Sequence, residues 1–297
     1  MTPHTFLTLT RASNLPSVWT NLLVGGSLGL VAGIQVHAPL WQWLTLLVAM
    51  SAIYMGGMLQ NDAFDADWDK HHQNRRPIAL GLARQTTVAL LAKLFLAGAL
   101  VLLMIQAWWS GHAQPALILL LAAALLFTIW SYNRWHKQQP HCAWLMGLCR
   151  VQVYLLAAGM LGQFSWMLAG CAAILAAYIA SVTYLARNEH LANISLSPRE
   201  HWPLLLLTAP LGVLTFSHPH WLLYPLLLLF CGWVIWHLKL SLLSQQAPLR
   251  KLIGALLAAI SLIDALILAA LNHPIASLAC VGAFLLMPRL QRWVAAT

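Results

Sequence analysis

Charged side chains are scarce in this sequence. Sixteen basic and seven acidic residues carry all the formal charge of 297 residues, which is 8% of the chain, whereas a soluble domain has about 25%. Apolar residues make up 61%, and the mean hydropathy is +0.74. So little charge cannot cover a soluble body of this size. A water-soluble enzyme and a disordered chain are therefore excluded, and the composition indicates a multi-pass membrane protein.

Several other features are missing. There is no CxxC motif and no metal-ligand spacing among the five cysteines, which all lie in apolar stretches and are expected to be buried free thiols. No Ser/Gly linker or long polar block divides the chain, so we expect residues 1–297 to form a single transmembrane domain. We also expect no cleavable signal, because Arg11 is followed by polar Ser13 and Asn14.

Long apolar runs predict an all-α fold. About 20 helical residues cross a hydrocarbon core of about 30 Å. Ten segments qualify in composition: 15–36, 40–60, 86–108, 113–133, 142–161, 166–186, 201–217, 220–240, 250–271 and 274–288. Segments 201–217 and 274–288 are short, and either could re-enter the membrane instead of crossing it. The sequence therefore predicts a polytopic bundle of nine to ten transmembrane helices.

The basic residues occur in small groups at alternate turns between these segments. If the N-terminus is cytoplasmic, every Lys and Arg outside the segments lies on the cytoplasmic side. The opposite turns, near 37–39, 109–113, 162–165, 217–219 and 272–274, contain none. This pattern favours ten crossings with both termini cytoplasmic, in the inner or cell membrane of a bacterium. The net charge of +9 thus reflects topology and does not indicate nucleic-acid binding.

The acidic residues are concentrated just after the second segment. Asp62, Asp65, Asp67 and Asp69 are four of the seven acids in the chain. If the helix of residues 40–60 continues through them, Asn61, Asp65 and Asp69 are spaced i, i+4, i+8 and share one face. Asp62 lies beside that face, whereas Asp67 points elsewhere. The spacing therefore predicts a site on the cytoplasmic side made from four of these five residues.

Carboxylates stacked on one helix face repel one another, and a divalent cation would remove that repulsion. A set of oxygen ligands without His or Cys suits Mg²⁺, which usually shares its coordination with substrate phosphates. We therefore expect Mg²⁺ to be held by Asn61, Asp62, Asp65 and Asp69. The alternative is a solvated cytoplasmic loop that happens to be acidic. His71 and His72 follow the cluster and are expected to be solvated, because Mg²⁺ does not favour imidazole.

Two stretches of sequence resemble a known family. The run Asn61-Asp62-x-x-Asp65-x-x-x-Asp69 is followed by Arg75-Arg76-Pro77, and the first segment opens with Asn14-Leu15-Pro16-Ser17-Val18-Trp19-Thr20-Asn21. Together they resemble the first aspartate-rich motif and the first span of the UbiA superfamily of intramembrane prenyltransferases. The resemblance implies a helical bundle with a central cavity open to lipid. It also implies two cytoplasmic acidic motifs that bind Mg²⁺ and a prenyl diphosphate, with transfer of the prenyl group to an aromatic or other lipophilic acceptor.

The second motif departs from the family pattern. In the family a basic residue, an Asp and a further Asp follow the sixth span, whereas this chain has Tyr184-Leu185-Ala186-Arg187-Asn188-Glu189-His190. The resemblance assigns Arg187 to catalysis, Tyr184 and Asn188 to diphosphate binding, and Glu189 to the metal. Alternatively, Arg187 and Glu189 are ordinary helix-end charges. The chain would then be a non-catalytic family member that binds or transports a lipid or metabolite.

Three further polar residues lie within or at the ends of apolar segments. Arg150 could reach the diphosphate or extend to the interface, and Lys137 could face the phosphate or serve as an anchor. Asp264 is the one acid inside a predicted span, where it has a functional or a structural hydrogen-bonding role. A third hypothesis is an unrelated transporter with the acidic cluster as a cation site. Transporters place ionisable groups near the midplane, and Asp264 alone is that deep.

Overall fold

The structure is a computed structural model that describes residues 1–32, 38–72, 76–110, 114–187, 202–215, 221–243 and 249–295. All regular elements of these residues are helices. They are α1 (Pro3–Leu9), the 3₁₀ turn η1 (Ala12–Asn14), α2 (Leu15–Ala32), α3 (Leu40–His71), α4 (Gln85–Trp109), α5 (Pro115–Trp135), α6 (Cys142–Leu161), α7 (Trp166–Arg187), α8 (Trp202–Leu205), the 3₁₀ helix η3 (Leu206–Thr215), α9 (Leu223–Leu243), α10 (Leu249–Ala270) and α11 (Pro274–Trp293). The predicted all-α fold is confirmed.

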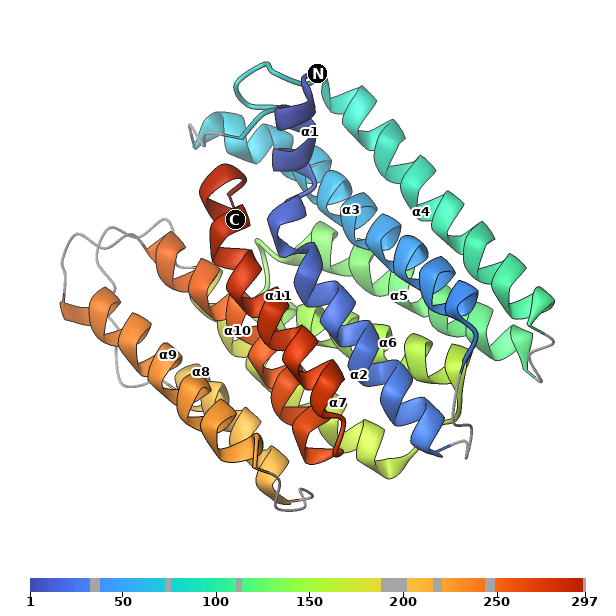
Figure 1. The fold of residues 1–297 in the computed structure, drawn as a ribbon. Helices are drawn as coiled ribbons and strands as arrows, with labels where there is room; N and C mark the ends of the chain where they lie inside the picture. The colour runs from blue at the N-terminus through green and yellow to red at the C-terminus, as the bar shows by residue number, and fades with distance from the viewer. Residues whose placement is uncertain are drawn as a thin grey trace.

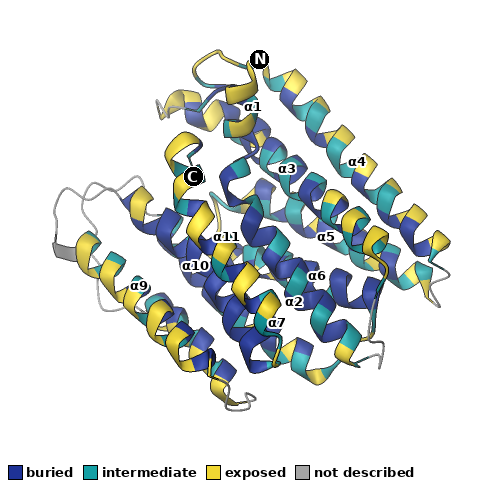
Figure 2. Cartoon of the chain, in the orientation of Figure 1, coloured by how far each residue is buried: buried dark blue, intermediate teal, exposed yellow. Residues whose placement is uncertain are grey.

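Helix α10 forms the centre of the bundle. Its apolar residues run all round the helix, and 94% of its membrane window is buried, against 22% for each of α4, α9 and α11. Figure 2 shows α10 buried along its length, while α4 and α9 present exposed faces to the outside. Helices α2, α7, α9 and α11 pack around α10. The outer helices therefore supply the surface that faces lipid.

Nine helices of the described residues are long and apolar enough to cross a membrane. The predicted segment 201–217 is the exception, since it forms only α8 and η3, with a shorter apolar stretch at Pro203–Thr215. A 3₁₀ helix rises about 2.0 Å per residue, so this short segment covers more of the bilayer than an α-helix of equal length. Figure 1 shows both termini toward the same end of the bundle. Which side of the membrane that end faces stays a prediction.

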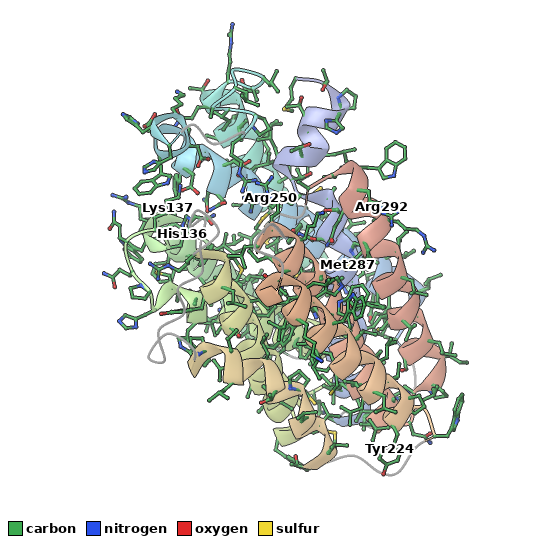
Figure 3. The ribbon with its side chains drawn as sticks, turned by 90° about the vertical axis from the view of Figure 1, so that its left-hand side faces the viewer. His136, Lys137, Tyr224, Arg250, Met287 and Arg292 are labelled. Carbon is green, nitrogen blue, oxygen red and sulfur yellow. The ribbon has the colours of Figure 1, made fainter. Side chains whose placement is uncertain are left out.

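The segment predicted at 274–288 is longer than expected. Helix α11 continues to Trp293 and is long and apolar enough to cross, so of the two alternatives for this segment the structure favours a crossing. Pro288, Arg289 and Arg292 end the apolar run in the sequence, but the helix accommodates Pro288. The basic residues belong to the last turns of α11, at the end of the bundle that also carries His136, Lys137 and Arg250, opposite Tyr224 (Figure 3).

Helix α3 is the longest element. Its 32 residues extend about 48 Å at 1.5 Å per residue, well beyond a hydrocarbon core of about 30 Å. The last ten residues therefore project past the apolar part of the helix, and they contain the acidic cluster. The assumption that the second span continues as a helix through Asp69 is confirmed.

Helices α2 and α6 approach each other closely and run in the same direction (Figure 1). A Cβ atom at Gly25 would lie 2.6 Å from the carbonyl oxygen of Tyr154, and one at Gly29 would lie 2.6 Å from the Cα of Ala158. Small residues four apart allow this contact, as in many membrane helix pairs. One helical turn earlier, the same register brings Asn21 of α2 into contact with Arg150 of α6.

Candidate functional site

The end of α3 places the predicted acidic face against the rest of the protein. Asn61, Asp62 and Asp69 are buried, with exposed fractions of 6%, 3% and 5%. Asp65 is partly buried, and Asp67 is exposed. The structure thus separates Asp67 from the other four residues, in agreement with the helical phase expected from the sequence. The roles of these residues as ligands remain a proposal.

Arg11 contacts one end of this face. Its Nη2 atom lies 3.2 Å from Asp62 Oδ1 and donates to Asn61 Oδ1 at 3.0 Å. The backbone of Arg11 is left-handed, with φ of 46° and ψ of 46°, which is uncommon for a residue other than glycine. This turn between α1 and η1 directs the guanidinium to α3. Sequence reasoning took Arg11 only as a topology-setting charge, because 50 residues separate it from its partners.

Lys137 and His136, just past the end of α5, contact the other end of the face. Lys137 Nζ lies 3.2 Å from Asp65 Oδ2 and 3.6 Å from Asp69 Oδ1, and His136 Nε2 lies 3.3 Å from Asp65 Oδ2. Figure 3 shows His136 and Lys137 side by side next to the end of the bundle. Lys137 was expected to face a phosphate and does lie at the acidic cluster. His136 was not identified from the sequence.

A second arginine lies near the first. Arg76 follows α3 after a short connection, and its guanidinium interacts with Arg11, Asp62 and Asp69. The charge of Arg11, together with burial, lowers the pKa of Arg76 below its usual value. Burial lowers the pKa of Arg11, but the Asp62 carboxylate and other nearby groups raise it, and the net direction is upward. Both arginines stay charged, so an anion would relieve the repulsion between them.

The chemistry of the donor atoms fits Mg²⁺. Asn61, Asp62, Asp65 and Asp69 offer oxygen atoms only, and Asp62 Oδ2 is buried with no hydrogen-bond partner in the described part of the chain. Within that same part, no three His, Cys, Asp or Glu side chains converge closely enough to hold a metal ion. The carboxylates instead contact Arg11, His136 and Lys137. A metal would therefore have to displace these side chains.

The other predicted site residues lie elsewhere or outside the described residues. Arg187 ends α7 and is half-buried, and its Nη1 atom has no hydrogen-bond partner among the described residues. Asn188 and Glu189 lie outside the described residues, so their predicted roles stay predictions. Arg150 lies within α6 and contacts α2, and no hydrogen bond or ion pair of the described residues joins it directly to the acidic face.

Tyr184 lines a pocket of about 220 Å³ between α6, α7 and the α8–η3 segment. The lining residues are Pro140, His141, Ala143, Trp144, Ala180, Tyr184, Pro203 and Leu206. Six of these eight residues are proline, alanine, leucine or tryptophan, so the pocket suits an apolar group. The pocket does not include the acidic residues of α3. The central cavity open to lipid stays a prediction.

Comparison with known protein families identifies the family of this chain. The model of the UbiA prenyltransferase family matches residues 22–253, which is most of the sequence and includes the acidic end of α3. The chain belongs to this family. It is an integral membrane protein with multiple spans, and the family resemblance seen in the sequence is confirmed. No curated protein matches the sequence.

Solved structures share the fold of this family member at low sequence identity. A structure of digeranylgeranylglyceryl phosphate synthase is 18% identical, with a TM-score of 0.51 over 98% of this chain and 95% of that chain. The apo structure of a UbiA homologue from Aeropyrum pernix K1 is 14% identical, with a TM-score of 0.50 over 97% of each chain. A UbiA homologue from Archaeoglobus fulgidus bound to DMAPP and Mg²⁺ is 13% identical, with a TM-score of 0.49 over 96% of this chain and 99% of that chain.

Proposed function

We propose that the protein transfers an isoprenyl group from a prenyl diphosphate to a lipophilic, aromatic acceptor in a Mg²⁺-dependent reaction within the membrane. The observation that carries the proposal is the end of α3, where an oxygen-rich face meets Arg11, Lys137 and Arg76. Metal ligands and phosphate-binding cations thus lie in one place. Membership of the prenyltransferase family supports the reaction class.

In this proposal Asn61, Asp62, Asp65 and Asp69 hold Mg²⁺. Bound there, Mg²⁺ would neutralise the diphosphate and stabilise the charge that develops on it as a leaving group. The same carboxylates would release Arg11 and Lys137, whose N–H groups would then donate to diphosphate oxygens. Arg76 would add a third donor from the connection after α3. The cations that neutralise the carboxylates without substrate are therefore the ones that bind the substrate.

The apolar bundle contributes the environment of the reacting carbon. When the allylic C–O bond breaks, the electron pair leaves with the diphosphate, and the remaining carbocation must meet the acceptor before water. The site lies at the end of apolar helices, so the isoprenyl chain would extend into the bundle or the lipid. Arg187, with Tyr184, Asn188 and Glu189, would approach the diphosphate from α7. Asn188 offers an oxygen without a charge, so this second wall would bind Mg²⁺ more weakly than α3 does.

Turnover tests the proposal directly. Purified protein would be incubated with Mg²⁺, radiolabelled prenyl diphosphates of several chain lengths and membrane lipid extract, and diphosphate release and labelled lipid would be measured. We expect release that requires Mg²⁺ and stops when EDTA removes it. Asp67→Ala serves as the matched control for Asp65→Ala, because Asp67 is exposed and off the site face. Mg²⁺-dependent binding without any release would instead indicate the non-catalytic binder or transporter.

A further inference from the structure

The N-terminal residues 1–14 contact two separate parts of the bundle. On one side Leu9 is fully buried in a small apolar cluster with residues of α3 and α4. On the other side His4 Nε2 lies 3.2 Å from the backbone oxygen of Trp293, at the end of α11. Figure 1 shows α1 at this end of the bundle, close to the end of α3. Residues 1–14 therefore bridge α3 and α11, and we call this segment the strap.

The strap covers one end of the proposed metal site. Arg11 of the strap donates to Asn61 Oδ1 at 3.0 Å and lies 3.2 Å from Asp62 Oδ1. The exposed fractions of Asn61 and Asp62 are only 6% and 3%. A metal ion and a diphosphate cannot reach side chains this buried unless an element that covers them moves. The structure therefore shows the site in a closed arrangement.

Of the elements that cover the acidic face, the strap is the one most easily detached. Helix α1 has seven residues, of which only Thr5 and Leu9 are buried, and isolated helices shorter than about 12 residues are marginal. Its end is joined to α11 by a long hydrogen bond, from Gln291 Nε2 to Asn14 Oδ1 at 3.3 Å. Lys137, at the other end of the face, directly follows the spanning helix α5. Segments with few buried contacts open first, so the strap is expected to move before α5 does.

The closed arrangement leaves a polar atom unpaired on each side of its ion pair. Arg11 Nε and Asp62 Oδ2 are both buried and have no hydrogen-bond partner in the described part of the chain. Such atoms are uncommon, because each loses the hydrogen bonds that water would give it. Arg11 also has a left-handed backbone, with its carbonyl oxygen accepting from the Tyr54 hydroxyl at 3.4 Å. A second arrangement, with Mg²⁺ on Asp62 and an anion on Arg11, would satisfy both atoms.

We infer that the strap is a gate operated by the substrate. It covers the acidic face while Arg11 pairs with Asp62, and it opens when Mg²⁺ and a prenyl diphosphate replace these two partners. The inference rests on the proposed function, since the ligands that open the strap are those of the proposed reaction. Opening separates Leu9 from its apolar cluster and His4 from Trp293. The two ends of the strap therefore provide separate places to observe and to block the movement.

Thiol labelling measures the opening. Thr10 ends α1 and is 0% exposed, so Thr10→Cys places a buried thiol on the strap. A water-soluble maleimide would label the purified full-length protein, and mass spectrometry of its peptides would give the rate at residue 10 alone. We expect Mg²⁺ with geranyl diphosphate to raise this rate at least about tenfold. Adding Arg11→Met should raise it without any ligand, because the ion pair that holds the strap is gone.

Thr128→Cys is the matched control for Thr10→Cys. Both threonines are buried and both donate to the carbonyl oxygen four residues earlier, but Thr128 lies within α5. Its labelling rate should not change with the ligands or with Arg11→Met. A rise at both positions would indicate general loosening of the protein and would overturn the inference.

Locking the strap tests whether its movement is needed. His4 and Trp293 are exposed, so His4→Cys and Trp293→Cys can be joined by a short, cleavable cross-linker. The cross-link should weaken Mg²⁺-dependent binding of geranyl diphosphate at least about tenfold, and its cleavage should restore the affinity. A strap with a merely structural role would give no recovery on cleavage.

Two results would overturn the inference. One is a labelling rate at residue 10 that stays the same when calorimetry shows both ligands bound, and the other is wild-type affinity in the cross-linked protein. Failure of Mg²⁺ and geranyl diphosphate to bind the wild type would instead remove the proposed function. The ligand-free labelling rates with and without Arg11→Met would then still decide whether the ion pair holds the strap closed.

Discussion

Two polar regions of this protein use the same kinds of side chain in different ways. At the end of α3, Asp62, Asp65 and Asp69 contact their cations directly, at 3.2 to 3.6 Å. In the interior, Arg150 and Asp264 are separated by the amide of Asn21. Direct pairs near the end of the bundle can exchange partners when Mg²⁺ and a diphosphate arrive. The interior pair is fixed by helices on both sides, so it can orient a group but cannot rearrange easily.

The largest effect is expected at the end of α3, where helical phase separates Asp65 from Asp67. Asp65→Ala should weaken Mg²⁺-dependent binding of geranyl diphosphate by about 100-fold or more, because it removes a proposed charged ligand from the site face. Asp67→Ala should change it by less than about twofold, since residue 67 lies about 200° from residue 65 around the helix. Equilibrium binding of radiolabelled geranyl diphosphate measures both. Equal losses would mean that the cluster acts only as diffuse charge.

The interior region can be disrupted by a change in helix packing alone. Gly25→Ala would place a Cβ atom 2.6 Å from the Tyr154 carbonyl oxygen, so α2 and α6 must separate. We expect a loss of about 1–3 kcal/mol of stability, as for overpacked cores, seen as a lower midpoint in thermal denaturation. Gly98→Ala on α4 is the control, because its Cβ would meet nothing within 4 Å. If both variants melt alike, the close contact does not fix the Asn21–Arg150 register.

If Mg²⁺ and the diphosphate replace the ion-pair partners at the end of α3, a substitution of Lys137 should have opposite effects on the binding of the two ligands. Lys137→Met removes the cation that competes for Asp65 and Asp69, so Mg²⁺ alone should bind about two- to fivefold more tightly. The same change removes a phosphate donor, so geranyl diphosphate with Mg²⁺ should bind about tenfold more weakly. Calorimetry with each ligand measures both signs. The neighbouring exposed Arg134 provides the control Arg134→Met, which should change neither. Two changes in the same direction would contradict the exchange.

The smallest effect is expected at the second wall. Asn188→Asp restores a carboxylate where the family pattern has one, so geranyl diphosphate with Mg²⁺ should bind about threefold more tightly, within the range of a partly exposed charge pair. Asn188→Gln keeps the residue neutral and should leave the affinity near that of the wild type. Radiolabelled geranyl diphosphate again provides the measurement. No change with Asp would place residue 188 outside the site.

The local part of the site could be predicted from the sequence, but its partners could not. Spacing i, i+4, i+8 correctly joined Asn61, Asp65 and Asp69 on one helix face, because that geometry depends only on the helix. Arg11 was missed as a partner, since its contact with Asp62 depends on a left-handed turn 51 residues away in sequence. His136 was missed because its pairing with Asp65 depends on how α5 packs against α3.

For the fold as well, local features could be predicted from the sequence and contacts between distant residues could not. Apolar run lengths predicted the helices, whereas the ten crossings favoured by the alternate basic turns stay a prediction, since nine helices of the described residues are long and apolar enough to cross. The predicted bounds of the segments were wrong where a helix does not coincide with the apolar run of the sequence. Helix α11 runs through Pro288 to Trp293, and segment 201–217 forms mainly 3₁₀ helix. The bridge from Asn21 to Asp264 spans 243 residues of sequence and follows only from the packing of α2 on α10.

The most direct test of the account is the affinity of the wild-type protein for Mg²⁺ with and without geranyl diphosphate, measured by calorimetry. Because the carboxylates of α3 are paired with Arg11 and Lys137, Mg²⁺ alone must displace those cations, whereas the diphosphate accepts them. The account predicts that geranyl diphosphate tightens Mg²⁺ binding at least about tenfold, and that Mg²⁺ tightens diphosphate binding by the same factor. Equal Mg²⁺ affinities with and without the diphosphate would contradict it.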